Sequence, residues 1–285
     1  MPTIRLKSFY NELHLKLRGL HNIQEARRVA LIVLEEVISI QMKDILSGKS
    51  MFIPKEKEAQ LEKILYRLLK NEPVQYVLRK AYFYDRSFQV NPTVLIPRQE
   101  TEELVFKIVG DHQHLHQLEI LDIGTGSGCI AVTLALELPR SQVWALDIDS
   151  RAIKTAMINA DSLNARVNNF NFDILSKQGL PGIYDVIVSN PPYVRESEKN
   201  ALHKQVIDYE PHTALFVPDE DPLIFYRHIA EKSLDSLRQG GHLYFEINQQ
   251  FADQTADLLT SFEYENVAIY NDLNDKPRIV CATKP

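Results

Sequence analysis

A regular alternation of strand-like and helix-like segments constrains this chain more than any other feature. From about residue 96 onward, short apolar runs rich in β-branched residues are separated by longer stretches with apolar residues at helical spacing. This alternation predicts an α/β fold: a doubly wound, mostly parallel sheet with ligands at the carboxyl ends of its strands. The predicted strands are Leu118–Ile123, Gln142–Asp147, Asn168–Phe172, Tyr184–Ser189, Gly241–Ile247, Glu263–Tyr270 and Arg278–Ala282. The helices predicted between them include Ser127–Leu138, Arg151–Asn159 and Pro222–Leu237.

The chain before this alternation follows other patterns. Apolar residues such as Ala30, Val33 and Val37 recur at helical spacing, which predicts a small N-terminal helical bundle. The next stretch alternates and is rich in aromatic residues, as a connecting β-hairpin would be. The predicted parts are a helical domain at 1–78, a hairpin linker at 79–95 and an α/β domain at 96–285.

The composition limits the setting in which the protein works. The net charge of −6 argues against non-specific binding to a nucleic-acid backbone, which needs clustered lysine and arginine. Cys129 and Cys281 lie in apolar surroundings without metal-ligand spacing, which predicts buried free thiols in a reducing compartment. The N-terminus lacks an uninterrupted apolar signal region, and no apolar run is long enough to cross a bilayer. We therefore expect a cytoplasmic protein without a membrane partner, with a monomer as the default.

The histidine-rich stretch DHQHLHQ, residues 111–117, suggests a metal site at first sight. On a continuous helix His112 and His116 would share one face, but no cluster of carboxylates or cysteines accompanies them. We predict a polar segment before the first strand and no metal site.

The segment ILDIGTGSGCIA joins the first predicted strand to a helix. Gly124, Gly126 and Gly128 let the backbone turn tightly and approach a ligand without a Cβ clash, although a tight turn alone also explains such a loop. The next strand ends in Asp147, where a carboxylate could hold a ribose diol. A nicotinamide dinucleotide would use the same acid, but its fingerprint places the third glycine one position later, at Cys129. S-adenosylmethionine has no phosphate groups and needs only backbone room, an acid and a slot for adenine.

The candidate cofactor site extends to the end of the third strand. There the stretch NFDIL offers Asp173 to the adenine amino group and Ile174 to the adenine face, although Ile174 could equally be a core side chain. Another acid, Asp122, lies just before the glycines. The predicted cofactor-binding residues are Gly124, Thr125, Gly126, Ser127, Gly128, Asp147, Asp173, Ile174 and Asn190.

The tetrapeptide NPPY directly follows the fourth predicted strand. Pro191 and Pro192 lack the N–H that a sheet ladder needs, so the strand must stop before them. In this topology the fourth strand neighbours the strand of the glycine loop, so the elbow would lie beside the cofactor. A planar NH2 group could donate to the Asn190 side-chain carbonyl and to the Pro191 backbone carbonyl, while the Tyr193 ring stacks on it. The alternative is a plain strand-terminating turn.

At these residues the chain resembles a class I S-adenosylmethionine-dependent methyltransferase, with a Rossmann-like, seven-stranded sheet. NPPY resembles the [D/N/S]-P-P-[Y/F/W] signature of enzymes that methylate planar nitrogens in nucleic acids or proteins. The stretches NEPVQYVL, FQVNPTVLIPRQETEELV and YEPHTAL resemble the peptide chain release factor N5-glutamine methyltransferases, the PrmC/HemK family. The resemblance covers essentially the whole chain. It departs from the family pattern at Arg79, where glycine is usual, at Gln99, where proline is usual, and at Ile174, where an aromatic residue is common.

The resemblance implies a reaction and a partner. A methyl group would pass from S-adenosylmethionine to the side-chain amide nitrogen of a glutamine in a class 1 release factor, leaving S-adenosylhomocysteine. The resemblance implies that Asn190 to Tyr193 bind the substrate glutamine, and we predict Asn190, Pro191 and Tyr193 as the catalytic residues. We predict that Arg98 and Glu100, with Pro192, also contribute to substrate binding by shaping the peptide groove. Arg98 and Glu100 could instead be an ordinary capping and salt-bridge pair.

The helical domain at 1–78 would dock the release factor. Two alternative functions stay open at this point. One is an amino methyltransferase acting on adenine or guanine in RNA or DNA, and the other is a non-catalytic module that binds translation factors.

Overall fold

The computed structural model describes residues 4–19 and 22–285, which divide into two compact units. The first unit comprises Met1–Lys80 and Lys204–Tyr209, and the second comprises Ala81–His203 and Glu210–Pro285. The helical domain predicted at 1–78 includes residues 1–3 and 20–21, which lie outside the described residues.

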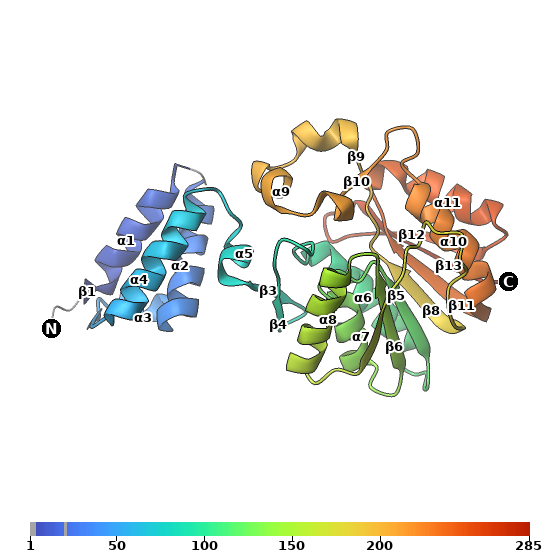
Figure 1. Cartoon of the computed structure of the whole chain (residues 1–285), viewed down its shortest axis with the longest axis horizontal. Coiled ribbons are helices and arrows are strands. Elements are labelled where there is room, and N and C mark those ends of the chain that lie inside the picture. The colour runs from blue at the N-terminus through green and yellow to red at the C-terminus, as the bar shows by residue number, and fades with distance from the viewer. Residues whose placement is uncertain (1–3, 20–21) are drawn as a thin grey trace. The chain divides into compact units, whose positions relative to one another are not determined.

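The first unit is mainly helical, as the apolar spacing predicts (Figure 1). Its elements are β1 (Ile4–Arg5), α1 (Leu6–Leu17), α2 (Ile23–Ile38), α3 (Met42–Leu46), β2 (Ser50–Met51), α4 (Lys55–Leu68), α5 (Val74–Leu78) and α9 (Lys204–Tyr209). The buried side chains of α1, α2 and α4 form one apolar core because each helix carries its apolar residues on one face. Helix α9 joins this unit from a distant part of the chain, and its Tyr209 hydroxyl donates a hydrogen bond to the Lys70 carbonyl at 2.7 Å.

Helix α5 ends in a left-handed residue. Arg79, its C-cap, has φ of 56° and ψ of 35°. Glycine adopts this conformation at the lowest cost because it has no Cβ. The structure thus gives a physical reason for the glycine that is usual in the resembled family, and arginine bears that strain here.

The second unit contains the predicted seven-stranded sheet (Figure 1). Its main elements are α6 (Gln99–His112), β5 (Glu119–Ile123), α7 (Cys129–Glu137), β6 (Gln142–Asp147), α8 (Ser150–Ser162), β7 (Val167–Asn171), β8 (Tyr184–Ser189), α10 (Ile224–Ser236), β11 (Leu237–Glu246), α11 (Ala252–Ser261), β12 (Glu265–Asn271) and β13 (Pro277–Thr283). Shorter elements are β3 (Lys80–Phe83), β4 (Arg86–Gln89), β9 (Val194–Arg195), η1 (Glu196–Ala201), η2 (His212–Ala214), β10 (Phe216–Val217) and η3 (Gln249–Phe251), where η marks a 3-10 helix. All predicted strands of the sheet are confirmed. The largest boundary difference is at β11, which begins at Leu237 and not at Gly241.

The strands lie in the order β12-β13-β11-β8-β5-β6-β7. Strand β13 is antiparallel to both of its neighbours, and the pairs from β11 to β7 are parallel. From β5 the chain builds outward through β6 to β7 and then returns to the other side of β5 as β8. The carboxyl ends of β5 and β8 therefore flank the topological switch point, where doubly wound sheets bind ligands.

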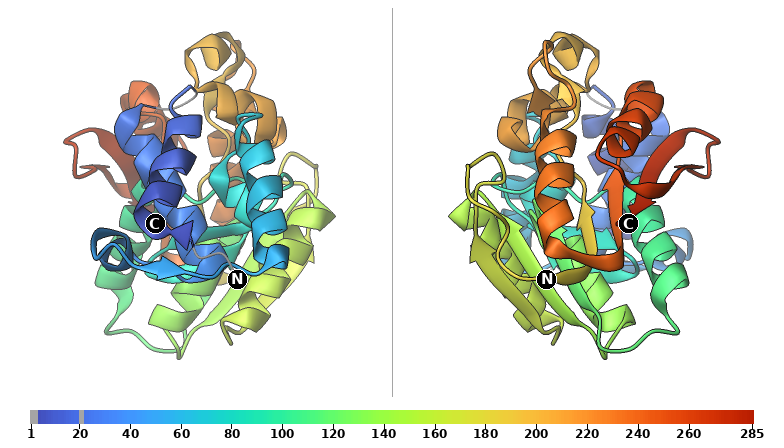
Figure 2. Two further views of the ribbon diagram at one scale, coloured as in Figure 1. Left: turned by 90° about the vertical axis from the view of Figure 1, so that its left-hand side faces the viewer. Right: turned by 90° about the vertical axis from the view of Figure 1, so that its right-hand side faces the viewer.

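Helices cover both faces of the sheet. One apolar cluster joins α6, α7 and α8 to one face, and a second joins α10 and α11 to the other (Figures 1 and 2). Successive residues of β8 alternate between them: Val186 and Val188 belong to the first cluster and Ile187 to the second. All three are fully buried, which explains why the strand has an uninterrupted apolar sequence.

The predicted hairpin is formed by β3 and β4. Its two turn residues, Tyr84 and Asp85, have positive φ angles of 50° and 57°, as the tightest hairpin turns require. Phe83 and Phe88 are buried in the same cluster as α6 and α7. The apolar side of the hairpin therefore packs into the core of the second unit.

Helix α6 ends at His112, so His112 and His116 do not share a helix face. The buried His112 Nε2 lies 3.0 Å from the Tyr244 hydroxyl, whereas His116 is exposed and lies beside Arg140. Within residues 4–19 and 22–285, no group of three or more histidine, cysteine or acidic side chains is arranged to hold a metal ion. Cys129 and Cys281 are buried and free, as predicted. Among the described residues, no helix has the length and apolarity that crossing a membrane requires.

Candidate active site

A cavity of about 370 Å³ opens at the carboxyl ends of the central strands. Such a volume is typical of small-molecule sites. Its wall includes residues 124–127 of the glycine loop, residues 146–149 at the end of β6, residues 172–175 after β7, residues 189–192 at the end of β8, and the segments 93–95, 97–98 and 213–214. The fold therefore brings together, at one cavity, almost all the residues predicted to hold the cofactor; Gly128 is the exception.

The three loop glycines have different surroundings. All have positive φ, with values of 75°, 55° and 80° for Gly124, Gly126 and Gly128. A Cβ at Gly124 or Gly126 would meet no atom within 4 Å, so the backbone there borders open space in the cavity wall. A Cβ at Gly128 would come within 3.0 Å of the Ala156 Cβ. Gly128 thus allows close packing of the loop against α8 and does not face the cavity.

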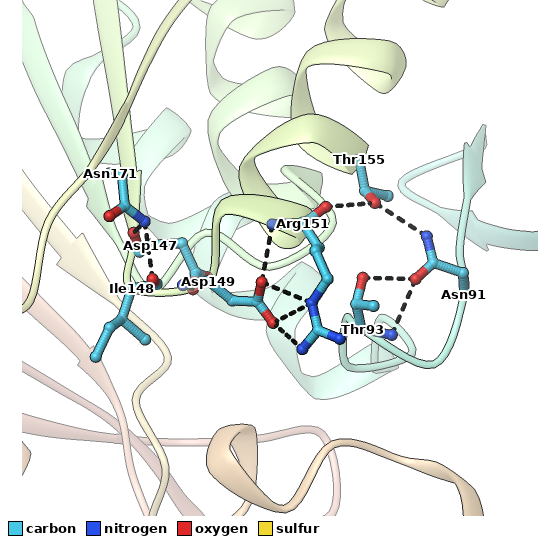
Figure 3. Close-up of polar contacts among 8 residues, drawn as sticks. All are labelled: Asn91, Thr93, Asp147, Ile148, Asp149, Arg151, Thr155 and Asn171. Atoms are coloured by element: carbon cyan, nitrogen blue, oxygen red, sulfur yellow. Dashed lines mark hydrogen bonds and ion pairs between the residues drawn. The ribbon is translucent and has the colours of Figure 1, made fainter.

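Asp147 ties the end of β6 to the glycine loop. Its Oδ2 accepts a hydrogen bond from the Gly126 N–H and its Oδ1 from the Asp149 N–H, both at 2.9 Å. Figure 3 shows Asp147 between Asn171, which donates to the Asp147 carbonyl, and the ion pair of Asp149 with Arg151. Burial raises the pKa of Asp147, while the two backbone N–H groups favour its ionised form. Each carboxylate oxygen keeps a lone pair that can accept a further hydroxyl.

Asp122 supports the glycine loop from the protein interior. It is fully buried and does not line the cavity. Its Oδ2 accepts from the Thr125 hydroxyl at 2.7 Å and from the Ala131 N–H at 3.3 Å. Burial raises the pKa of Asp122 to about 7. Its contacts are those of a residue that holds the turn in shape.

The segment after β7 forms the opposite side of the cofactor end. Asp173 is exposed, lines the cavity and accepts the Leu175 N–H at 2.8 Å. Ile174 is 8% exposed, belongs to the core cluster of α10 and also lines the cavity. The two interpretations of Ile174, a core side chain or an apolar wall for a ring, are therefore compatible.

These observations fit S-adenosylmethionine. The space beside Gly124 and Gly126 suits a ligand part that lies against the backbone, and Asp147 presents free lone pairs in the same wall. The apolar side chain of Ile174 suits a planar ring. These residues would hold the methionine, ribose and adenine parts respectively.

The NPPY elbow forms the other end of the cavity. Strand β8 ends at Ser189, as the two prolines predict, and Asn190, Pro191 and Pro192 line the cavity. Tyr193 is not part of that wall. Its ring packs against the core cluster of α10, and its hydroxyl donates to Glu246 Oε1 at 3.1 Å. In this structure the Tyr193 ring therefore does not line the cavity in which it was predicted to stack on the substrate amide.

Two further polar residues support Asn190, and sequence reasoning missed both. The Asn190 Nδ2 donates to the Thr101 hydroxyl oxygen at 3.2 Å, and the Thr101 hydroxyl donates to Glu246 Oε2 at 2.6 Å. Thr101 and Glu246 are 2% and 1% exposed. Burial raises the pKa of Glu246, and the Thr101 and Tyr193 hydroxyls act against that rise. A glutamate at the end of the otherwise apolar run LYFEI was the available signal, because acids are rarely buried without partners.

Arg98 and Glu100 do not form the pair considered from the sequence. Arg98 lines the cavity, and its Nη2 lies 2.6 Å from Oε1 of the buried Glu210. The second oxygen of Glu210 accepts the Ile96 N–H at 3.2 Å, so Glu210 fixes this part of the wall. Glu100 lies in the first turn of α6, outside the cavity wall. At that position its negative charge interacts favourably with the helix dipole.

A third missed residue, Asn159 on α8, joins the hairpin to the glycine loop. Its Nδ2 donates to the carbonyls of Gln89 and Ser127 at 2.9 and 2.8 Å, and its Oδ1 accepts the Gln89 N–H at 2.6 Å. One turn away, Thr155 accepts from Asn91 Nδ2 at 3.0 Å (Figure 3). Helix α8 thus holds the chain that enters the cavity wall at residue 93.

Two family models match the chain. Residues 14–78 match the PrmC N-terminal domain, and residues 103–212 match the methyltransferase small domain. The chain is 43% identical to the release factor glutamine methyltransferase of Bacteroides thetaiotaomicron, over 94% of this chain and 96% of that one. It is 38% identical to the enzyme of the same name from Flavobacterium psychrophilum, over 96% of this chain and 98% of that one.

Solved structures share the fold at low sequence identity. A methyltransferase from Pyrococcus furiosus aligns with a TM-score of 0.52 and 17% identity, over 80% of this chain and 98% of that one. The hMettl16 catalytic domain in complex with the MAT2A 3'UTR hairpin 6 aligns with a TM-score of 0.55 and 16% identity, over 84% and 86% of the two chains. The fold is therefore that of a methyltransferase. Given also the full-length identity to its curated relatives, this chain belongs to the release factor glutamine methyltransferase family.

Proposed function

We propose that this chain transfers the methyl group of S-adenosylmethionine to the side-chain amide nitrogen of a glutamine in a class 1 peptide chain release factor. The observation that carries the proposal is the single cavity whose wall contains both the glycine loop with Asp147 and the elbow Asn190–Pro192. One end of this cavity suits the cofactor. The other end offers the acceptors that a planar NH2 group needs.

At the cofactor end, the chain's own groups bind and orient. Gly124 and Gly126 leave room beside the backbone, and Asp147 offers carboxylate lone pairs to hydroxyl groups. When bound, S-adenosylmethionine supplies a methyl group that is electrophilic because it is attached to a sulfonium.

At the elbow, two acceptors hold the substrate nitrogen. The side-chain oxygen of Asn190 and the backbone carbonyl of Pro191 would each accept one N–H of the glutamine amide. These bonds raise the electron density on a nitrogen whose lone pair is otherwise delocalised into the carbonyl. Holding the nitrogen in line accounts for much of the remaining acceleration, since positioning can contribute about 7–11 kcal/mol.

A side-chain base is not assigned. The described residues of the cavity wall include no histidine or lysine. The amide proton becomes acidic as the new bond forms, and it can then leave to solvent.

The first unit would recognise the release factor. A cavity at strand ends contacts too little of an exposed loop to select one protein among many. A second contact surface is therefore needed, and we propose that helices α1–α5 provide it. Glycine neighbours of the target glutamine would let the substrate backbone approach the elbow. We further propose that the protein acts as a monomer in the cytoplasm, which fits its buried free thiols and acidic balance.

Mass spectrometry tests the substrate directly. The protein is incubated with S-adenosylmethionine and an intact class 1 release factor, and in parallel with ribosomal and transfer RNA. We expect a gain of one methyl group on one release factor glutamine and none on RNA. Methylated adenine or guanine with an unmodified release factor would refute the proposal in favour of a nucleic-acid substrate.

A shortened chain beginning at Tyr82 tests the docking role. It should keep its cofactor affinity and its rate on a short glutamine peptide, but lose kcat/KM on the intact factor. Calorimetry with the cofactor first shows that the shortened chain is folded. Equal kcat/KM of both chains on the intact factor would rule out docking by the helices.

A further inference from the structure

Glu246 is a buried carboxylate that accepts hydrogen bonds from two hydroxyl groups. It lies at the carboxyl end of β11, where its Oε2 accepts from Thr101 at 2.6 Å and its Oε1 from Tyr193 at 3.1 Å. Burial raises the pKa of Glu246, whereas these two donors and the nearby Arg278 favour its ionised form. An ionised carboxylate has no proton to donate, so the directions of both hydrogen bonds are fixed.

Because Thr101 donates to Glu246, it can only accept a hydrogen bond from Asn190. A threonine hydroxyl has one proton, and in Thr101 this proton is used in the hydrogen bond to Glu246. Thr101 can then offer only lone pairs to the Asn190 side chain, which lies 3.2 Å away. Only the NH2 group of Asn190 can meet those lone pairs, because the amide oxygen would place two acceptors against each other. The amide oxygen of Asn190 is thereby kept away from Thr101.

We propose that Glu246, acting through Thr101, holds the Asn190 amide with its oxygen available to the cavity. Glu246 and Thr101 are then positioning residues for the substrate amide. An inverted Asn190 would present NH2 to the substrate NH2 and could not accept from it. The role of this orientation in methyl transfer rests on the proposed function, whereas the orientation itself does not.

The test compares two conservative changes at Thr101. Thr101→Val removes the hydroxyl and keeps the shape, and Thr101→Ser keeps the hydroxyl. With saturating S-adenosylmethionine and release factor, Thr101→Val should lower kcat about tenfold or more, because Asn190 loses the partner that orients it. Thr101→Ser should stay within about twofold of the wild type. The dissociation constant of S-adenosylmethionine, measured by calorimetry, should be unchanged in both.

Glu246→Gln provides a second, independent variant. A glutamine amide can turn either its oxygen or its NH2 toward Thr101, so the direction of the network is no longer imposed. The kcat should fall less than in Thr101→Val, by about two- to tenfold, at unchanged cofactor affinity.

A readout without turnover separates this inference from the proposed function. In the wild type, the side-chain NH2 protons of Asn190, followed by nuclear magnetic resonance, should exchange slowly because Thr101 accepts one of them. They should exchange faster in Thr101→Val and remain slow in Thr101→Ser. If the wild type methylates no release factor, the proposed function fails and the exchange rates still decide the orientation. Equal exchange in all three proteins, or equal losses of kcat in Thr101→Val and Thr101→Ser, would overturn the inference.

Discussion

The two ends of the cavity are built in different ways. At the cofactor end, backbone groups make the main contacts: the Gly126 and Asp149 N–H groups bind Asp147, and the Gly124 and Thr125 N–H groups bind the Leu146 carbonyl. At the elbow, the support of Asn190 is a row of side chains from three separate elements. Thr101 comes from α6, Glu246 from β11 and Tyr193 from the segment after β8.

This difference determines how each end responds to substitution. The bonds of the Gly124 and Thr125 N–H groups to the Leu146 carbonyl join backbone to backbone and remain when a side chain is removed. The loop at the cofactor end should therefore keep much of its shape and lose mainly the contacts of the deleted side chain. A row of buried side chains loses alignment along its length when one member is removed, because each group fixes the direction of the next. Substitutions should therefore affect binding at the first end and turnover at the second.

Asn190→Ala should have the largest effect on turnover. It removes the proposed acceptor and leaves the substrate nitrogen without alignment, so kcat should fall about 100-fold or more. The dissociation constant of the cofactor, measured by calorimetry, should stay within a few-fold. Asn168→Ala, on an exposed position of β7, is the matched control and should leave kcat unchanged. A variant that retains half of the wild-type rate would refute the role of Asn190 as an acceptor for the substrate amide.

Asn159→Ala tests whether the cofactor end depends only on backbone groups. It deletes three hydrogen bonds of a fully buried side chain, which should lower the free energy of unfolding by about 2–4 kcal/mol. Urea denaturation measures the change, and cofactor affinity should weaken because Ser127 loses its tether. Ser162→Ala, at an exposed position of the same helix, removes one hydroxyl hydrogen bond and serves as the control. Wild-type stability in Asn159→Ala would mean that the hairpin and the loop are held independently.

Asp147→Ala should weaken cofactor binding with little effect on turnover at saturation. A charge-assisted hydrogen bond contributes about 1.5–3 kcal/mol, so the dissociation constant should rise about tenfold or more. Asp147→Asn keeps one acceptor oxygen and should fall between the alanine variant and the wild type. Unchanged affinity by calorimetry would show that Asp147 does not bind the cofactor.

Tyr193→Phe should have the smallest effect. It removes one of the two hydroxyls that bind Glu246, while the Thr101 bond and the packed ring remain. We expect kcat to fall only about two- to fivefold. Tyr193→Ala also removes the packing behind the elbow and should lose considerably more rate. Equal losses in both variants would assign the function of Tyr193 to its hydroxyl.

The sequence was most informative where local chemistry fixes local structure. The prolines at 191 and 192 end β8 at Ser189, and the glycines at 124 and 126 adopt the positive φ angles that a tight loop requires. Asp147 lies at a strand end predicted to the residue. Helix α6 shows the opposite case, since nothing in DHQHLHQ indicated that the helix would stop at His112 and separate the histidines.

By itself, the sequence determined the order of strands and helices, the glycine loop, the elbow and the family to which the chain belongs. These depend on periodicity, on backbone restrictions of glycine and proline, and on motifs carried by adjacent residues. Only the tertiary structure decided which distant side chains support them. Thr101 and Asn190 are 89 residues apart in the chain, and Thr101 and Glu246 are 145 apart. The physical reason is that a buried polar group needs a hydrogen-bond partner, and the tertiary fold determines which distant residue lies close enough to be that partner. Local sequence patterns do not contain this information.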